Sequence, residues 1–268
     1  MKRTCLIVLV LGCAVLLYGH STALAQLSSF AVLGGSAVTN TATPTIVNGN
    51  LGVSPGSAVT GFPPGIVTGG TIHAADAVAA QAQSDLTTTY VNLANEACNT
   101  DLTGQDLGGK TLTPGVYCFA TSAQLTGTLT LDAQGNPNAV FIFKIGSTLT
   151  TASASSVLLT NGGSSCGVFW QVGSSATLGT GTALLGSIVA LTSITLNTGA
   201  SVSGRVLARN GAVTLDDSHV AVCSGGSANG PLFPAFSAAI PTLSEWAMIV
   251  MAVVLLLSAL TALRRRAA

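Results

Sequence analysis

The sequence predicts a mainly β fold, a solenoid of short stacked strands that is braced along its side by one α-helix. Three observations predict this architecture. Short segments that alternate apolar residues with threonines recur along the chain, and in its C-terminal half they repeat every 18 residues. Glycines and Asn-Gly pairs separate the segments, which suits the corners of a solenoid. One segment, at about residues 74–98, breaks this pattern and has the periodicity of a helix.

The 18-residue repeat is the strongest of these signals. Ala176-Thr177-Leu178-Gly179-Thr180-Gly181 aligns with Ile194-Thr195-Leu196-Asn197-Thr198-Gly199, and a third copy begins at Val213-Thr214-Leu215-Asp216. The pentapeptide GSAVT, found at Gly35–Thr39 and again at Gly56–Thr60, is a looser copy. Side chains alternate between the two faces of a strand, so each copy predicts a core face and a threonine face. A β-sandwich is the second interpretation, but it gives no reason for an unvarying repeat.

The predicted helix, residues 74–98, carries an apolar stripe. Its members recur at steps of three and four and are Ala79, Ala82, Leu86, Tyr90, Leu93 and Ala97. Asp76, Asp85 and Glu96 are expected on the outer side of the helix. A helix of about 25 residues would extend about 37 Å, which lets it run alongside about six to eight coils spaced about 4.8 Å apart.

Charge is scarce in this chain. Only 7% of the 268 residues are charged, whereas a soluble domain usually carries about 25%. Residues 26–225 hold eight acidic and four basic side chains, the latter being Lys110, Lys144, Arg205 and Arg209. Without a basic stripe the domain has no means of neutralising phosphates, which excludes nucleic acid as a partner. No residue pattern indicates a cofactor or a metal ion.

The N-terminus is typical of an export signal. Two basic residues at positions 2 and 3 precede an apolar run that ends at Tyr18, and Ala23-Leu24-Ala25 matches the small-x-small cleavage pattern. Residues 1–25 are therefore the predicted signal peptide. A lipoprotein acylation site at Cys13 is the alternative, but the leucine two residues before it fits that motif poorly.

The C-terminus predicts a membrane-spanning helix. Residues 247–263 carry no charge, and these 17 residues are at the short limit of the ~17–25 that span a bilayer. Arg264, Arg265 and Arg266 follow and should remain cytoplasmic. Residues 226–239 are rich in Gly, Ser, Ala and Pro and are expected to be a flexible linker.

The segment before this helix reads Ile240-Pro241-Thr242-Leu243-Ser244-Glu245-Trp246. It resembles the IPTL-type C-terminal sorting signal of Gram-negative bacteria, in which a short motif, one hydrophobic helix and a basic tail are read by a membrane-bound sorting peptidase. The resemblance covers residues 240–268 and implies a sorting peptidase as partner. A plain tail anchor is the alternative. Both interpretations imply an exported domain that is anchored in the membrane or, after processing, at the cell surface.

The mature domain contains four cysteines, which are Cys98, Cys118, Cys166 and Cys223. An even number in an oxidising compartment predicts two disulfides, with three possible pairings. We favour pairing the first with the second and the third with the fourth, because the first pair closes a short loop worth about 3 kcal/mol on a chain-entropy model. A zinc site is the alternative, but the cysteines lack C-x-x-C spacing and only His73 and His219 could assist.

Longer motifs connect residues 27 to about 223 to a known family. They are Phe30-Ala31-Val32-Leu33-Gly34-Gly35-Ser36-Ala37-Val38-Thr39, Asn50-Leu51-Gly52-Val53-Ser54-Pro55-Gly56, Leu112-Thr113-Pro114-Gly115-Val116-Tyr117, Asn138-Ala139-Val140-Phe141-Ile142-Phe143-Lys144-Ile145-Gly146-Ser147-Thr148-Leu149, Val168-Phe169-Trp170-Gln171-Val172-Gly173 and Gly204-Arg205-Val206-Leu207-Ala208. They resemble the β-solenoid ice-binding proteins of bacteria, fungi and algae. The resemblance implies a triangular, right-handed parallel β-helix flanked by one long α-helix. It also implies an interrupted solenoid, in which the coils before the helix complete the stack formed by later ones.

The expected partner is an ice crystal surface, bound by a monomer. Water hydrates a charge in a geometry unlike ice, so a surface that matches an ice lattice should be flat, uncharged and regularly furnished with hydroxyls and methyls. Threonine supplies both groups, although the sequence shows no strict threonine row. The candidate ice-binding residues are the outward threonines of the expected strands: Thr39, Thr60, Thr128, Thr130, Thr148, Thr150, Thr177, Thr195 and Thr214.

An enzymatic function is not expected. Parallel β-helices also host polysaccharide lyases and hydrolases, which need clustered carboxylates, basic groups or calcium. The comparable cluster here comprises Asp216, Asp217, His219, Arg205 and Arg209. Gly163-Ser164-Ser165-Cys166-Gly167 fits G-x-S-x-G, but neither the strand-to-helix turn nor a triad histidine is expected. The non-enzymatic alternative is a cell-surface adhesin or extracellular-matrix component that binds carbohydrate or neighbouring cells.

Overall fold

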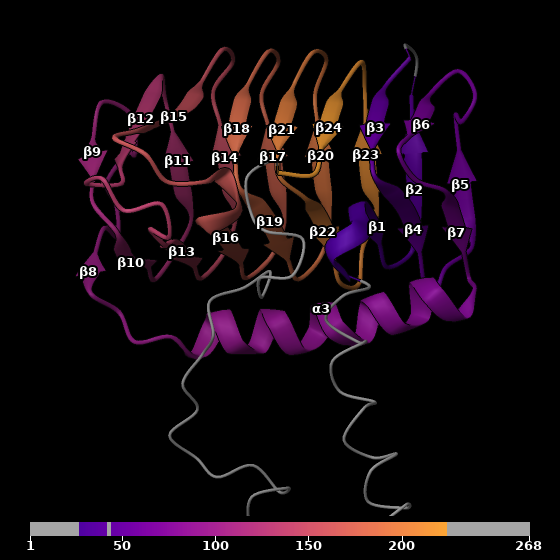
Figure 1. Ribbon diagram of the computed structural model, residues 1–268, viewed down its shortest axis with the longest axis horizontal. Helices are drawn as coiled ribbons and strands as arrows, with labels where there is room; N and C mark the ends of the chain where they lie inside the picture. The colour runs from indigo at the N-terminus through magenta and orange to yellow at the C-terminus, as the bar shows by residue number, and fades with distance from the viewer. Residues whose placement is uncertain (1–26, 42–43, 224–268) are drawn as a thin grey trace, which may run out of the picture. The chain divides into compact units, whose positions relative to one another are not determined.

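The computed structural model describes residues 27–41 and 44–223, which form three parallel β-sheets around an apolar core (Figure 1). In spatial order, sheet A consists of β7 (Ile72–Ala74), β4 (Asn50–Val53), β1 (Phe30–Gly34), β22 (Val206–Ala208), β19 (Ser187–Ala190), β16 (Val168–Val172), β13 (Phe141–Ile145), β10 (Gly115–Phe119) and β8 (Thr100–Asp101). Sheet B consists of β11 (Ala123–Leu125), β14 (Leu149–Thr151), β17 (Ala176–Leu178), β20 (Ile194–Leu196), β23 (Val213–Leu215), β2 (Ala37–Asn40) and β5 (Ala58–Thr60). Sheet C consists of β6 (Ile66–Thr68), β3 (Ile46–Asn48), β24 (His219–Ala221), β21 (Ser201–Ser203), β18 (Ala183–Leu185), β15 (Ser156–Thr160), β12 (Thr128–Asp132) and β9 (Thr111–Leu112). The predicted mainly β solenoid is confirmed.

Each coil of the solenoid crosses sheets A, B and C in turn. Strands β13, β14 and β15 make one coil, and β16, β17 and β18 make the next. Thr177 pairs with Thr195 and Ile188 pairs with Val206, each partner lying 18 residues later in the chain. The predicted 18-residue repeat is therefore the length of one coil.

The first coil of the described chain pairs with its last. Strand β1 pairs with β22 in sheet A, β2 pairs with β23 in sheet B, and β3 pairs with β24 in sheet C. The coils before the helix therefore extend the stack formed by those after it, which confirms the interrupted solenoid. The two GSAVT copies are neighbouring strands of separate coils, because Thr39 pairs with Thr60.

The glycine that opens each GSAVT copy is required where neighbouring coils touch. A Cβ atom on Gly35 would lie 2.3 Å from the carbonyl oxygen of Arg209, and one on Gly56 would lie 1.9 Å from that of Ser36. Both distances are far below van der Waals contact, so only a residue without Cβ lets the backbones stack at this corner. The repeated pentapeptide thus combines a stacking glycine with an outward threonine.

The interior of the solenoid is filled with apolar side chains from all three sheets. Phe143 and Trp170, from neighbouring coils, are fully buried and stack with ring centroids 4.0 Å apart. The Trp170 indole N–H donates to the Leu185 carbonyl oxygen at 2.9 Å. Close packing of this kind holds the strands of each sheet in one register.

Helix α3 (Ala77–Asn95) lies along the outer side of sheet A and contacts strands from β7 to β13 (Figure 1). It is three residues shorter at each end than the predicted helix, because both ends are capped. Asp76 Oδ1 accepts a hydrogen bond from Ala79 N at 2.8 Å, and Glu96 N donates to the Leu93 carbonyl oxygen. Its 19 residues extend about 28 Å and carry the chain from β7, at one end of sheet A, toward β8 at the other.

The predicted apolar stripe of α3, which includes Ala82 and Leu86, is buried against sheet A. The expectation that Asp85 lies on the outer side is wrong, because its side chain is 7% exposed. Sheet A is nine strands wide and covers the flank of the helix as well as the stripe. Burial raises the pKa of the Asp85 carboxyl, and the hydrogen bond that Oδ1 accepts from Gln81 Nε2 at 2.9 Å opposes this rise.

Within the described residues, no helix is long and apolar enough to cross a membrane. The predicted membrane-spanning helix at residues 247–263 lies outside them. The predicted signal peptide at residues 1–25 and the sorting segment at residues 240–268 also lie outside the described part of the chain.

Candidate functional site

A row of threonines runs along sheet B. The strand register places one residue from each strand side by side in the order Gln124, Thr150, Thr177, Thr195, Thr214, Thr39 and Thr60. Six of these seven residues are threonines, and with strands about 4.8 Å apart the six extend about 24 Å. The expectation that the chain has no strict threonine row is therefore wrong. Unequal coil lengths and the interruption by the helix hide the row in the sequence.

The threonine side chains of this row point away from the core. Thr195, for example, lies between Ile194 and Leu196, which are both fully buried. Successive side chains of a strand alternate between its faces, so the threonine side chain is outward. Neighbouring hydroxyls are close enough to interact: Thr60 Oγ1 donates to Thr39 Oγ1 at 3.2 Å.

A second row of small side chains flanks the threonines, two residues earlier on each strand and therefore on the same face. It comprises Ser122, Thr148, Ser175, Ser193, Ala212, Ala37 and Ala58. The hydroxyls of Ser122 and Thr148 share a hydrogen bond of 2.8 Å. Of this row only Thr148 was among the predicted residues, although the constant spacing from the threonines could have revealed the serines. Together the two rows form a strip of hydroxyls and methyls without a charged side chain.

The other two sheets present different surfaces. Helix α3 runs along the outer side of sheet A (Figure 1). Sheet C is open, but its outward side chains include the exposed Ile46, Ile66 and Leu158 as well as the imidazole of His219. Sheet B is therefore the face on which outward residues of one small, uncharged type recur from strand to strand.

The structure divides the nine predicted threonines between two faces. Six form the row on sheet B, and Thr148 lies in the flanking row. Thr128 and Thr130 lie on β12 in sheet C, where Thr128 Oγ1 and Ser156 Oγ share a hydrogen bond of 2.9 Å. These two threonines do not join the others, because their strand is one corner further along its coil.

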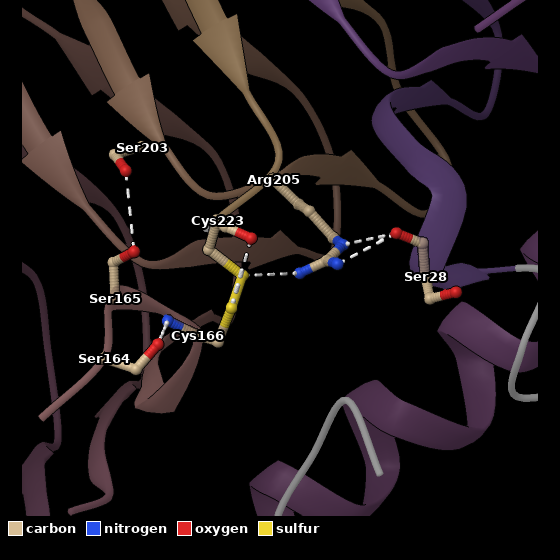
Figure 2. The surroundings of a disulfide bond; sticks show 7 residues. All are labelled: Ser28, Ser164, Ser165, Cys166, Ser203, Arg205 and Cys223. Atoms are coloured by element: carbon tan, nitrogen blue, oxygen red, sulfur yellow. Dashed lines mark hydrogen bonds between the residues drawn. A yellow bond between two sulfur atoms is a disulfide. The ribbon is translucent and has the colours of Figure 1, made fainter. Parts of the chain in front are cut away.

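Two disulfides close the domain, in the pairing that the sequence favours. Cys98–Cys118 joins the segment after α3 to β10, with Cα atoms 5.9 Å apart. Cys166–Cys223 joins the short helix η1 (Ser165–Gly167) to the segment after β24, with Cα atoms 5.4 Å apart (Figure 2). The G-x-S-x-G match therefore contains a disulfide cysteine, and Ser165 Oγ lies 3.5 Å from Ser203 Oγ.

Arg205 links the second disulfide to the start of the described chain (Figure 2). Its Nη1 donates to Cys223 Sγ at 3.3 Å, and its Nη2 donates to the Ser28 carbonyl oxygen at 2.9 Å. Burial of the guanidinium lowers the pKa of Arg205 to about 10, so the side chain remains charged at neutral pH. Arg205 therefore has a structural role at the point where the two ends of the domain meet.

The residues of the enzymatic alternative do not converge. Asp216 follows β23 at a corner, whereas His219 lies on sheet C. Arg205 is buried beside the disulfide, and the Arg209 guanidinium lies 4.8 Å from the centroid of the Tyr90 ring on α3. Among the described residues, no group of His, Cys, Asp and Glu side chains is placed to hold a metal ion.

Residues 32–221 match the sequence profile of the family described as ice-binding-like. The chain belongs to this family. An ice-binding protein of Nostoc sp. strain HG1 is 63% identical over 194 residues, which are 72% of this chain and 71% of that protein. Residues 238–267 match the IPTL-CTERM motif, so both resemblances drawn from the sequence are confirmed.

Solved structures extend the similarity of this ice-binding-like protein to its fold. A crystal structure of an ice-binding protein from an Antarctic biological consortium is 45% identical, with a TM-score of 0.71, and the match covers 74% of this chain and 89% of that one. A domain of Shewanella frigidimarina ice-binding protein 1 is 32% identical, with a TM-score of 0.69, and the match covers 74% and 96%. The IPTL-CTERM motif and the bacterial relatives support export and sorting to the cell surface.

Proposed function

We propose that this ice-binding-like protein adsorbs to ice through sheet B and thereby inhibits ice growth or recrystallisation. The observation that carries the proposal is the row of six threonines, aligned in register on an uncharged and open sheet. Its family and the ice-binding proteins that it resembles in sequence and structure support the same function.

Threonine suits this role because it carries a hydroxyl and a methyl group without a charge. Each hydroxyl-to-water hydrogen bond is worth only about 0.5–1.5 kcal/mol net. A rigid face that presents several such groups together binds with additive strength and loses little conformational entropy on adsorption. The buried residues beneath the row, such as Ile194 and Leu196, supply this rigidity.

Adsorbed molecules pin the advancing ice front. Ice then grows only between them, so its surface becomes curved and the local freezing point falls. In this proposal Thr39, Thr60, Thr150, Thr177, Thr195 and Thr214 bind ice directly, and Thr148 contributes from the flanking row. A monomer suffices, because one sheet carries the complete row.

We further propose that the protein acts at the surface of a Gram-negative bacterium. Residues 1–25 would direct export, and residues 247–263 would hold the chain in the membrane with the arginine tail in the cytoplasm. A sorting peptidase would then act on the segment that contains Ile240 to Trp246. The linker at residues 226–239 would let the ice-binding domain face outward.

Ice shaping and thermal hysteresis of residues 26–225 test the proposal. The relative from Shewanella frigidimarina was solved as a domain of similar extent, which indicates that the corresponding part of this chain folds alone. Faceted ice crystals and a gap between melting and freezing temperatures are the expected result. Absence of shaping, hysteresis and recrystallisation inhibition, in a sample shown to be folded by circular dichroism, would refute ice binding.

A pair of tyrosine variants tests the assignment to sheet B. Thr177→Tyr places a bulky ring within the row, whereas Thr130→Tyr places the same ring on sheet C. We expect Thr177→Tyr to reduce thermal hysteresis strongly and Thr130→Tyr to leave it near the parent value. The reverse result would move the ice-binding face to sheet C.

A further inference from the structure

A pocket of about 530 Å³ lies beside the C-terminal half of α3, where sheet A turns toward sheet B. Its wall includes Tyr90 of α3, Asp101 of β8, Lys144 of β13 and Gln171 of β16, and the Cys98–Cys118 disulfide forms another part of it. None of these residues belongs to the threonine row. The volume is within the ~300–1,000 Å³ that small-molecule sites occupy.

Gln171 is the feature that points to a ligand. It pairs in register with Lys144 on the outer side of sheet A, and it is only 5% exposed. Its side-chain amide has no hydrogen bond to another described residue. Buried polar side chains are almost always hydrogen-bonded, so an amide that lines a pocket without a partner is placed to bind a polar molecule there.

Lys144 and Asp101 add an ammonium and a carboxylate to the same wall. Lys144 Nζ donates to the Glu96 carbonyl oxygen at 2.5 Å, which fixes the ammonium and leaves it two further N–H donors. Asp101 Oδ1 accepts hydrogen bonds from Thr103 N at 2.8 Å and from Thr103 Oγ1 at 2.6 Å, which orient the carboxylate. The two opposite charges offset each other, so the pocket offers donors and acceptors without a net charge.

The remaining wall is apolar and fixed. The Tyr90 ring is held by the Arg209 guanidinium, 4.8 Å from its centroid, and the Cys98–Cys118 sulfur atoms lie in the same wall. Phe119 and Ile145 also line the pocket. Surfaces of this kind pack against C–H groups of a ligand, whereas the amide, ammonium and carboxylate bind its hydroxyls.

We propose that this pocket binds a neutral saccharide unit. Each sugar hydroxyl both donates and accepts, which matches the mixed set formed by Gln171, Lys144 and Asp101. An anion would be repelled by Asp101, a cation would be repelled by Lys144, and an apolar molecule would leave the Gln171 amide without a partner. Saccharide binding goes beyond ice adsorption, and it gives the protein a means of holding surface glycans or free sugars.

Nuclear magnetic resonance of ¹⁵N-labelled residues 26–225 tests this proposal. The probes are D-glucose, D-galactose, D-mannose and N-acetyl-D-glucosamine, followed by the disaccharides maltose, lactose and chitobiose. We expect saturable shifts of the backbone amides of Gly146, Gln171 and Gly173 with at least one probe. Tighter binding of a disaccharide than of its monosaccharide indicates a glycan chain as the source, and equal binding indicates a free sugar. No saturable shift of these amides with any probe overturns the proposal.

Three variants connect the signal to the pocket. Gln171→Met, Asp101→Asn and Lys144→Met are each expected to weaken saccharide binding about two- to tenfold, the effect of one lost hydrogen bond. Lys110→Met, which removes an exposed lysine at another corner, is the matched control and should bind as the parent does. Unchanged affinity in all three folded variants would contradict the proposed site.

Ice shaping measured on the same samples separates the two functions. The three pocket variants leave the threonine row intact, so they should shape ice as the parent does. Loss of saccharide binding with normal ice shaping concerns the pocket alone. A folded parent domain that binds a saccharide but does not shape ice would refute the proposed function and leave the saccharide site standing.

Discussion

Thr195 lies in the middle of the threonine row, with Thr177 and Thr214 in register on either side. A tyrosine at this position adds a ring that stands above the row and keeps ice away from both neighbours. Three of the six threonine contacts are then lost. A tyrosine in place of Thr60, at the end of the row, removes only its own contact and that of Thr39.

These geometries set the magnitudes. Three lost contacts at about 0.5–1.5 kcal/mol each weaken adsorption by about 1.5–4.5 kcal/mol, which is roughly tenfold to 2,000-fold in the binding constant. Two lost contacts at Thr60 amount to about 1–3 kcal/mol, or roughly fivefold to 150-fold. Thr195→Val keeps the shape of the side chain and removes one hydroxyl, so it should weaken adsorption about twofold to tenfold.

Partition of fluorescently labelled protein between ice and solution measures this order directly, with thermal hysteresis as a second readout. We expect the largest loss for Thr195→Tyr, a smaller one for Thr60→Tyr and the smallest for Thr195→Val. Thr130→Tyr on sheet C is the control for a non-specific effect of an added ring. Equal losses at the centre and the end of the row, or a loss for the control as large as that for Thr195→Tyr, would refute the reasoning.

Three further predictions concern stability. Burial raises the pKa of Asp85, so ionisation opposes folding, and the parent domain loses stability as the pH rises from below about 3.8 through the raised value; Asp85→Asn should therefore melt higher than the parent at pH 7 and converge with it in acid, as thermal unfolding followed by circular dichroism at pH 3–8 will show. Replacing both Cys166 and Cys223 by serine opens a crosslink between residues 57 apart and should cost about 4 kcal/mol, measured by urea unfolding; a change below about 1 kcal/mol would contradict the chain-entropy estimate. Gly56→Ala forces a Cβ against the Ser36 carbonyl oxygen and should cost about 1–3 kcal/mol in the same assay, so an unchanged midpoint would count against close coil stacking there.

Strand alternation and coil length could be predicted from the sequence because both depend on local pattern. Ile194 and Leu196 are inward and Thr195 is outward for the reason that alternation gives, and the 18-residue repeat is the length of a coil. The helix was predicted from its apolar stripe. The burial of Asp85 was not, because that depends on the width of the sheet beneath the helix.

The choice of face could not be predicted from local pattern. Thr128 and Thr195 lie in similar alternating segments, but they belong to different sheets. Alternation separates inward from outward residues, whereas the number of residues at each corner decides which sheet a strand joins. The proposed saccharide pocket was also hidden, because Asp101, Lys144 and Gln171 come from three strands that only the stacking of coils brings together.

The pairing of the first coil with the last has a consequence for the order of folding. Both ends of the described chain lie within the stack, and mid-chain segments form its two outer edges. Until β23 is in place, the threonine row exists as two separate pieces, Thr39 with Thr60 and the remainder beyond Thr214. Such long-range closure is a slow step in folding. Because contributions along the row multiply in the binding constant, a nascent or clipped chain adsorbs far more weakly than its share of threonines suggests, so full adsorption strength is reserved for completed molecules.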